Sequence, residues 1–219
     1  GGGVRGWVMI PLGATGLSTE EGAVRVDPLG VVRSIPGDPA VRVWFRPGVR
    51  TAMAPSPPGP DDRSVPAAIR PRLTEIAERF SAGATTPFER VERIADALRT
   101  RYRYSLQFER TPRVDPVIDF LDRHPQGHCE FFASSLALLG RAAGVPTRVV
   151  GGYRVAERNP IGDYFVVREK NAHAWVEAWD DARGWVTLDA TPESEVPQNV
   201  GHESRWWAAL GDGLAVMAG

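Results

Sequence analysis

The stretch Gly127-His128-Cys129-Glu130-Phe131-Phe132-Ala133-Ser134 begins the segment that decides the fold of this chain. From residue 131 to residue 143 the sequence is rich in alanine and leucine, and Gly144 and Pro146 follow. A glycine just past the last turn and a proline shortly beyond it are typical signals for the end of a helix. The pattern therefore predicts a largely apolar, buried helix that carries Cys129 in its first turn.

Cys129 is the single cysteine of the chain, which excludes an internal disulfide. A free cysteine is often a buried structural residue. The beginning of a helix, however, offers unpaired N–H groups and the positive end of the helix dipole, and both lower the pKa of a thiol. Gly127 lets the backbone turn sharply into this helix. We therefore predict that Cys129 is a nucleophile whose own backbone N–H stabilises the oxyanion of the attacked carbonyl.

The base and the acid expected beside such a nucleophile lie on two predicted strands. In residues 172–179, His173 shares one face with aromatic and acidic side chains, while only alanine and valine occupy the other face. If the hairpin pairs Trp179 with Arg183, Asp189 lies directly across from His173, with Cβ atoms about 5 Å apart. A carboxylate there fixes the imidazole tautomer and stabilises the imidazolium. The alternatives are a structural histidine and an aspartate that only caps the next turn.

Four segments of the chain resemble, in their order, the signature blocks of the transglutaminase-like superfamily. They read GHCEFFAS (127–134), AGVPTRVVGGY (143–153), AHAWVE (172–177) and GWVTLDATP (184–192). The resemblance covers roughly residues 65–195 and implies a catalytic triad of Cys129, His173 and Asp189. It also implies an α+β, papain-like fold in which the nucleophile helix packs on an antiparallel sheet.

Within this superfamily the chain is similar to a bacterial, membrane-anchored branch. The similarity lies in the Gly-His-Cys-Glu block, in a predicted short helix at Asp115-Pro116 and in the pair Trp206-Trp207. The resemblance implies an extracytoplasmic (periplasmic or cell-envelope) domain, taken from a bacterial parent protein that is embedded in the membrane. The chain itself contains no apolar run of about 18 residues. Its start at Gly1-Gly2-Gly3 lacks the features of a signal peptide and is typical of an excised piece.

The resemblance also implies the reaction. The acyl donor is the glutamine side chain of a protein or peptide, the acceptor is an amine, and no cofactor takes part. If water replaces the amine, the same triad makes a cysteine hydrolase, either a protease or a deamidase, and this is the second reading. A third reading, a non-catalytic peptide-binding module, is disfavoured by the intact set of Cys129, His173 and Asp189.

Further candidate site residues surround these three. Tyr104 or Gln126 could supply a second hydrogen bond to the oxyanion, although Tyr104 could equally fill an edge of the core. His128 precedes the nucleophile and is interpreted as a residue that shapes the cleft. Trp175 shares the predicted face of His173, which favours a place in the wall of a substrate groove.

The charge balance and the spacing of ligand-type residues argue against other classes. The 26 Lys and Arg residues against 27 Asp and Glu residues leave no excess of positive charge for nucleic-acid binding. His124, His128 and Cys129 lack the second pair of ligands that structural zinc requires, so we predict no metal. The chain also lacks a clustered acidic loop of the EF-hand type, which argues against activation by calcium.

We expect four regions along the chain. They are a β-rich N-terminal extension (1–50), a proline-rich connector (51–66), a transglutaminase-like catalytic domain (67–200) and a helical C-terminal tail (201–219). In the catalytic domain, apolar residues recur at helical spacing over residues 69–80, and Thr86-Pro87-Phe88-Glu89 predicts a capping box. The antiparallel sheet is predicted from the segments 147–155, 164–168, 172–179 and 185–189.

Overall fold

The computed structural model describes residues 14–19, 24–26, 32–34, 43–47, 56–154, 157–159 and 164–192. It divides the chain into two compact units, Gly1–Pro57 and Pro58–Gly219. The division lies inside the proline-rich segment, and the later part of that segment belongs to the second unit. There Asp61–Arg63 form a 3-10 helix, η1, and Val65 is buried. The predicted helical tail (201–219) lies outside the described residues.

The first unit contains two pairs of antiparallel strands. Strand β1 (Ala14–Thr19) pairs with β4 (Val43–Pro47), and β2 (Val24–Val26) pairs with β3 (Val32–Ser34). Residues 24–26, 31–33 and 41–45 are β-branched or aromatic in part and predict strands at the positions of β2, β3 and β4, but no such pattern marks β1. The segment of β1, Ala-Thr-Gly-Leu-Ser-Thr, carries little of the β-branched, alternating pattern that marks a strand.

The second unit combines helices with a central antiparallel sheet. Its helices are α1 (Arg70–Phe80), α2 (Pro87–Arg101), α3 (Pro116–Asp122) and α4 (Cys129–Ala142), with a second 3-10 helix, η2 (Glu169–Asn171). Its strands are β5 (Arg103–Tyr104), β6 (Gln126–Gly127), β7 (Thr147–Tyr153), β8 (Glu157–Asn159), β9 (Tyr164–Val166), β10 (Ala172–Asp180) and β11 (Gly184–Leu188). Among the described residues, no helix combines the length and the apolar composition that crossing a bilayer requires.

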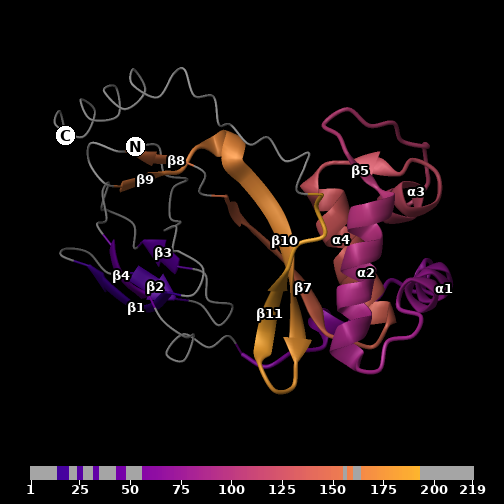
Figure 1. Cartoon of the computed structure of the whole chain (residues 1–219), viewed down its shortest axis with the longest axis horizontal. Helices are drawn as coiled ribbons and strands as arrows, with labels where there is room; N and C mark the ends of the chain where they lie inside the picture. The colour runs from indigo at the N-terminus through magenta and orange to yellow at the C-terminus, as the bar shows by residue number, and fades with distance from the viewer. Residues whose placement is uncertain are drawn as a thin grey trace. The chain divides into compact units, whose positions relative to one another are not determined.

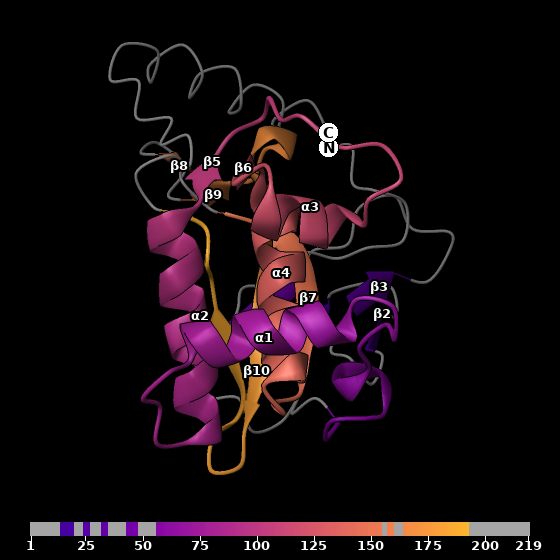
Figure 2. The same ribbon diagram turned by 90° about the vertical axis from the view of Figure 1, so that its right-hand side faces the viewer.

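Helix α4 lies at the centre of this unit, between the sheet and the helices α1 and α2. The sheet has the strand order β11-β10-β7, and the helices lie to one side of it (Figure 1). Helix α4 packs against β10, and α1 and α2 pack against α4. Figure 2 looks from the helical side, where α1 crosses in front of α4 with β10 and β7 behind. The predicted α+β class, with the Cys129 helix on an antiparallel sheet, is confirmed.

One predicted strand does not belong to that sheet. The segment 164–168 was expected as a fourth strand, but its strand β9 pairs antiparallel with β8 in a separate two-stranded ribbon. Strand β8 was not predicted. Consecutive strands joined by a short connection usually pair with each other, and this local hairpin takes the place of pairing with the central sheet.

Helix α4 is held on the sheet by close contacts at several points. Its buried residues include Phe132, Leu136 and Leu139, which recur at helical spacing. A Cβ on Gly140 would lie 2.7 Å from the Thr147 Cγ2 atom, so this glycine allows helix and strand to approach closely. The helix stops where the sequence predicts, because Gly144 adopts a φ of +87° that a helix C′ residue requires.

Helix α2 begins with a variant of the predicted capping box. The Glu89 N–H donates to the Thr86 side chain at 3.1 Å, as the pattern predicts. The Glu89 carboxylate, however, accepts from the Thr85 N–H at 2.7 Å and the Thr85 hydroxyl at 2.8 Å, instead of returning to the N-cap N–H. The return bond of the box is therefore shifted by one residue, because Thr85 offers two donors to a single carboxylate.

The register of the β10–β11 hairpin differs from the prediction. The structure pairs Trp179 with Trp185, not with Arg183. The pairing that was expected to bring Asp189 directly across from His173 is therefore wrong. Continued along the ladder, the observed register would place Asp189 across from Trp175. Because the difference is two residues, each side chain still lies on its predicted face.

Turn geometry explains this register. Asp180 pairs with Gly184, which leaves a loop of residues 181–183. The Asp180 Oδ1 atom accepts hydrogen bonds from the N–H groups of Ala182 (3.0 Å) and Arg183 (2.8 Å). Gly184 has a φ of +75°, which a side chain would strain, so the glycine closes the loop and starts the second strand.

Candidate active site

Cys129 is the first residue of α4. The N-cap residue His128 has an extended backbone (φ −88°, ψ 178°), so the chain enters the helix directly at the cysteine. As a first-turn residue, Cys129 has a backbone N–H that the helix itself does not use. Gly127, which was predicted to let the backbone turn sharply into the helix, does not have a positive φ. It provides space instead, because a Cβ there would lie 2.7 Å from the Phe131 ring.

The structure brings the three predicted triad residues together. His173 lies near the start of β10 with 8% of its surface exposed, and Asp189 follows the last residue of β11. The His173 Nε2 atom lies 2.7 Å from the Asp189 Oδ2 atom. The Cys129 thiol lies close enough to the His173 ring and to the backbone N–H of Ala174 for both groups to lower its pKa. Because Nε2 faces Asp189, the Nδ1 atom is the ring nitrogen that remains for Cys129.

These contacts shift the pKa values of Cys129, His173 and Asp189 in the directions that favour the charged form of each side chain. Burial by itself lowers the pKa of His173, but the hydrogen bond with Asp189 and the interaction with Cys129 outweigh it and raise this pKa to about 9. Burial raises the pKa of the Cys129 thiol, but the interactions with His173 and with the Ala174 backbone lower it overall. The pKa of Asp189 is likewise lowered, against the effect of burial, by its bonds to His173 and Thr191. The arrangement favours a thiolate beside an imidazolium.

Asp189 has three further contacts: the first caps the next turn, as the alternative reading of the sequence expected, and the other two were indicated by no sequence pattern. Its Oδ1 atom accepts from the Thr191 N–H at 2.9 Å. Its backbone carbonyl accepts from the Arg99 Nη2 atom on α2 at 2.7 Å. The Arg154 Nη2 atom lies 3.9 Å from the carboxylate Oδ2 atom. Arg99 and Arg154 are distant from Asp189 along the chain, so neither spacing nor motif could have linked them to it.

The two candidates for a second oxyanion donor lie in paired short strands. Strands β5 and β6 run parallel, with Tyr104 beside Gly127 and Arg103 beside Gln126. Burial and then the charge of the nearby Cys129 raise the pKa of Tyr104, so its hydroxyl stays protonated. A protonated hydroxyl near the nucleophile can donate a hydrogen bond. Gln126 lies one position earlier in β6, and its side chain is half-buried.

Aromatic rings border the triad on two sides. The His128 ring lies 5.3 Å from that of Phe108 and 5.0 Å from that of Phe131, measured between centroids. The Trp175 ring stacks on the His173 imidazole at 6.1 Å and 28°. Trp175 also covers Gly152, where a Cβ would lie 2.5 Å from the indole. Both His128 and Trp175 thus lie next to a triad residue, and their roles as cleft and groove residues remain predictions.

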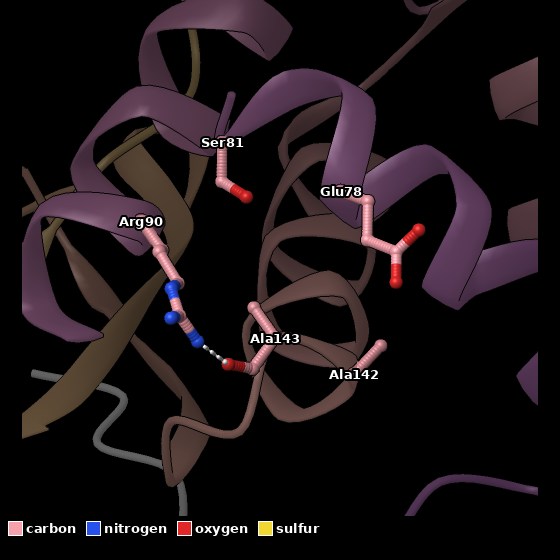
Figure 3. A pocket seen from close by; sticks show the side chains of 5 residues that line it. All are labelled: Glu78, Ser81, Arg90, Ala142 and Ala143. Atoms are coloured by element: carbon pink, nitrogen blue, oxygen red, sulfur yellow. Dashed lines mark hydrogen bonds between the residues drawn. The ribbon is translucent and has the colours of Figure 1, made fainter. Parts of the chain in front are cut away.

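The described part of the chain offers no group of three or more His, Cys, Asp or Glu residues arranged to hold a metal ion. It does contain a hollow of about 330 Å³ where α1, α2 and α4 meet (Figure 3). Ala142 and Ala143 line this hollow at the end of α4 opposite to Cys129. At about 1.5 Å per helical residue, that end lies about 20 Å from the thiol, so the hollow is separate from the triad.

Comparisons with known proteins bear on this site. A family model described as the transglutaminase-like superfamily matches residues 74–190, more than half of the chain. A protein-glutamine gamma-glutamyltransferase of Pseudomonas aeruginosa is 46% identical over 78 residues, which are 36% of this chain and 12% of that protein. The uncharacterized protein YebA of Bacillus subtilis is 31% identical over 134 residues, 58% of this chain and 18% of that protein. The chain thus spans less than a fifth of either relative.

A solved structure is similar over most of the chain. The periplasmic domain of TgpA from Pseudomonas aeruginosa superposes with a TM-score of 0.67 at 26% identity. The superposition covers 86% of this chain and 66% of that one.

Proposed function

Because this chain belongs to the transglutaminase-like superfamily, we propose that it is a cysteine acyltransferase that joins protein-bound glutamine side chains to amines. The match over residues 74–190 confirms the family expected from the four sequence blocks. The observation that carries the proposal is the grouping of Cys129, His173 and Asp189: His173 Nε2 lies 2.7 Å from the Asp189 carboxylate, and the His173 ring lowers the pKa of Cys129. This grouping supplies a nucleophile, a proton carrier and the group that orients it.

In the first half of the reaction, the Cys129 thiolate attacks the side-chain carbonyl carbon of glutamine. The oxyanion that forms accepts a hydrogen bond from the backbone N–H of Cys129 and a second from the Tyr104 hydroxyl. When the carbon–nitrogen bond breaks, the His173 imidazolium gives its proton to the leaving ammonia. The product is a thioester on Cys129 and a neutral imidazole.

In the second half, an amine attacks the thioester carbonyl. His173, now neutral, takes a proton from the amine as the carbon–sulfur bond breaks, and the thiolate and imidazolium are restored. The product is an isopeptide bond. Water in place of the amine would give glutamate, so amine access and exclusion of water decide the outcome.

The similarity to a periplasmic domain supports a place for this reaction outside the cytoplasm. We propose that the chain is the extracytoplasmic domain of a longer, membrane-embedded bacterial protein. Its substrates are then proteins or peptides of the cell envelope that expose a glutamine side chain, and its acceptors are amines present in the same compartment.

The test is incorporation of a fluorescent primary amine into a glutamine-bearing carrier protein by the purified chain. We expect covalent labelling of the carrier together with release of ammonia, and neither with Cys129→Ala. Ammonia release without labelling would assign the hydrolase reaction instead. If wild type and Cys129→Ala give the same background in both measurements, the proposed acyl transfer is overturned.

A further inference from the structure

We infer that Arg99, on helix α2, is the positioning residue that holds Asp189 in place beside His173. The inference rests on the proposed function, because it assigns Arg99 a role in the working geometry of the proposed triad. Arg99 does not contact the reacting atoms. It acts through the main chain of Asp189, to which it donates a 2.7 Å hydrogen bond.

Asp189 needs such a support because the sheet does not hold it. The β10–β11 ladder ends at the pair Val176 and Leu188. The residues of β10 before this pair, including His173, have their ladder partners in β7. Asp189 therefore reaches His173 from a segment that has just left the sheet, and strand pairing cannot set the distance between the two side chains.

The guanidinium of Arg99 connects this segment to α2. Its Nη2 atom donates to the carbonyl oxygen of Asp189, while its Nη1 atom donates to the Asp96 Oδ1 atom at 2.5 Å. Asp96 lies one turn earlier on the same helix, so it fixes the orientation of the guanidinium. Hydrogen bonds from a charged donor are stronger than neutral ones. The contact therefore ties the backbone of Asp189 to a rigid helix.

A second anchor acts on the carboxylate and complements the first. The Thr191 N–H holds the Asp189 Oδ1 atom at 2.9 Å, which leaves Oδ2 facing His173. Ala190 and Thr191 are both 3% exposed, so the chain after Asp189 is packed. Thr191 thus sets the rotation of the side chain, and Arg99 sets the position of the backbone that carries it.

The contribution of Arg99 is one of position, not of charge. A positive charge near the triad disfavours the imidazolium, so charge alone would oppose the protonated state of His173. The bond goes to the carbonyl of Asp189, which does not titrate. Loss of Arg99 should therefore act like a small displacement of the carboxylate, which can cost a large factor in rate.

The chain supplies a matched control in Arg90. This residue lies on the same helix, and its Nη1 atom donates to a backbone carbonyl, that of Ala143, at 3.3 Å. The bond lies in the hollow at the other end of α4 (Figure 3). Arg90→Ala therefore removes the same kind of interaction from α2 without touching the triad.

The experiment measures two quantities on the full chain: the rate of Cys129 alkylation by iodoacetamide across pH, and kcat and KM for amine incorporation. For Arg99→Ala we expect kcat and the alkylation rate near neutral pH to fall about tenfold or more. KM should stay within about twofold of the wild-type value, because the loss of Arg99 removes no contact with the bound substrate. In a pH profile of kcat, the alkaline fall should move to lower pH, because a displaced Asp189 supports the imidazolium less. Arg99→Lys, which keeps a donor, should recover part of the loss, and Arg90→Ala should behave as wild type.

The outcomes separate this inference from the proposed function. If Arg99→Ala and Arg90→Ala give the same kcat and the same pH profile, Arg99 is not a positioning residue. If wild type and His173→Ala give the same pH profile of Cys129 alkylation, the proposed thiolate–imidazolium pair fails, whatever the result for Arg99. Thermal unfolding of both variants checks the fold. Should Arg99→Ala unfold at the assay temperature, Arg99→Lys and Arg99→Gln decide the question, and wild-type kinetics in both would overturn the inference.

Discussion

His173 lies between two groups that both favour its protonated form. Asp189 lies 2.7 Å from Nε2, and Cys129 lies close enough to the ring to raise its pKa. Burial lowers the pKa of His173, but these two partners raise it to about 9. Since the same contact with His173 lowers the pKa of Cys129, each of the two residues supports the charged form of the other. The predictions at the scale of single residues follow from this coupling.

Cys129→Ala should abolish amine incorporation, because no other cysteine can form the thioester. A first-turn cysteine replaced by alanine costs little in helix propensity, so the unfolding midpoint should change only slightly. The measurement is incorporation of a fluorescent amine, with circular dichroism as the check on the fold. Residual incorporation above the background of a heat-inactivated sample would show that Cys129 is not the nucleophile.

The rate of Cys129 alkylation should depend on pH in a way that requires His173. The thiol pKa lies below its ordinary value, so alkylation should persist at pH values where an ordinary thiol is protonated. The catalytic rate should fall again as the pH rises through about 9, where His173 loses the proton that the leaving ammonia needs. In His173→Ala, burial should raise the thiol pKa, and rapid alkylation should require alkaline pH. An unchanged pH profile in this variant would contradict the coupling.

Asp189→Asn should lower kcat about a hundredfold or more, because the amide tends to hold the imidazole in the wrong tautomer. It should also move the alkaline limb of the profile to lower pH, because the carboxylate no longer supports the imidazolium. Asp181→Asn is the matched control, since Asp181 lies in the same hairpin and its carboxylate accepts a 2.9 Å hydrogen bond from the Trp179 indole N–H, away from the triad. Equal activity in the two variants would show that Asp189 is not a member of the catalytic triad.

At the scale of elements, the position of the Trp175 indole near the triad depends on a glycine of β7. Gly152 is the cross-strand partner of His173, and a Cβ there would lie 2.5 Å from the Trp175 indole. That indole stacks on the His173 ring. The His173 imidazole is therefore positioned in two ways: its backbone pairs with Gly152 of β7, and its ring packs against the Trp175 indole.

Gly152→Ala should force the indole of Trp175 away from its place, at a cost of about 1–3 kcal/mol in the free energy of unfolding. Because the indole packs on His173, kcat should fall as well. Gly151→Ala is the control, since a Cβ at Gly151 meets no atom within 4 Å. Denaturant unfolding and amine incorporation measure the two effects. Equal behaviour of the two variants would show that Trp175 adapts without disturbing the site.

At the scale of the whole molecule, the described residues of the site all lie in one compact unit. Cys129, His173, Asp189 and Arg99 all lie in Pro58–Gly219, and the buried core cluster runs from Val65 to Ala190. A unit with its own hydrophobic core can fold independently. The described contacts of the triad residues likewise come from this unit.

A chain shortened to Pro58–Gly219 should therefore unfold cooperatively and retain the alkylation rate and pH profile of Cys129. Thermal unfolding followed by circular dichroism tests the first statement, and iodoacetamide kinetics test the second. The same shortened chain carrying Cys129→Ala serves as the blank. A broad, non-cooperative transition would show that the second unit needs the first one to fold.

The sequence by itself determined the features that depend on neighbours along the chain. The start of α4 at Cys129 and its end before Gly144 follow from apolar spacing and from a glycine with positive φ. The N-cap at Thr86 and the alternation of faces along β10 are equally local. The family could also be identified from the four blocks, because each block is a contiguous motif whose residue types the site needs together.

The tertiary structure alone decided how these pieces meet. The hairpin register itself is set locally, by the bonds of Asp180 within the loop and by the φ of Gly184, but the structure shows that this register leaves Asp189 beyond the ladder. The bond from Arg99 to Asp189 joins residues 90 positions apart. No local pattern encodes such a contact, because it exists only after α2 and the end of β11 have packed on the same core.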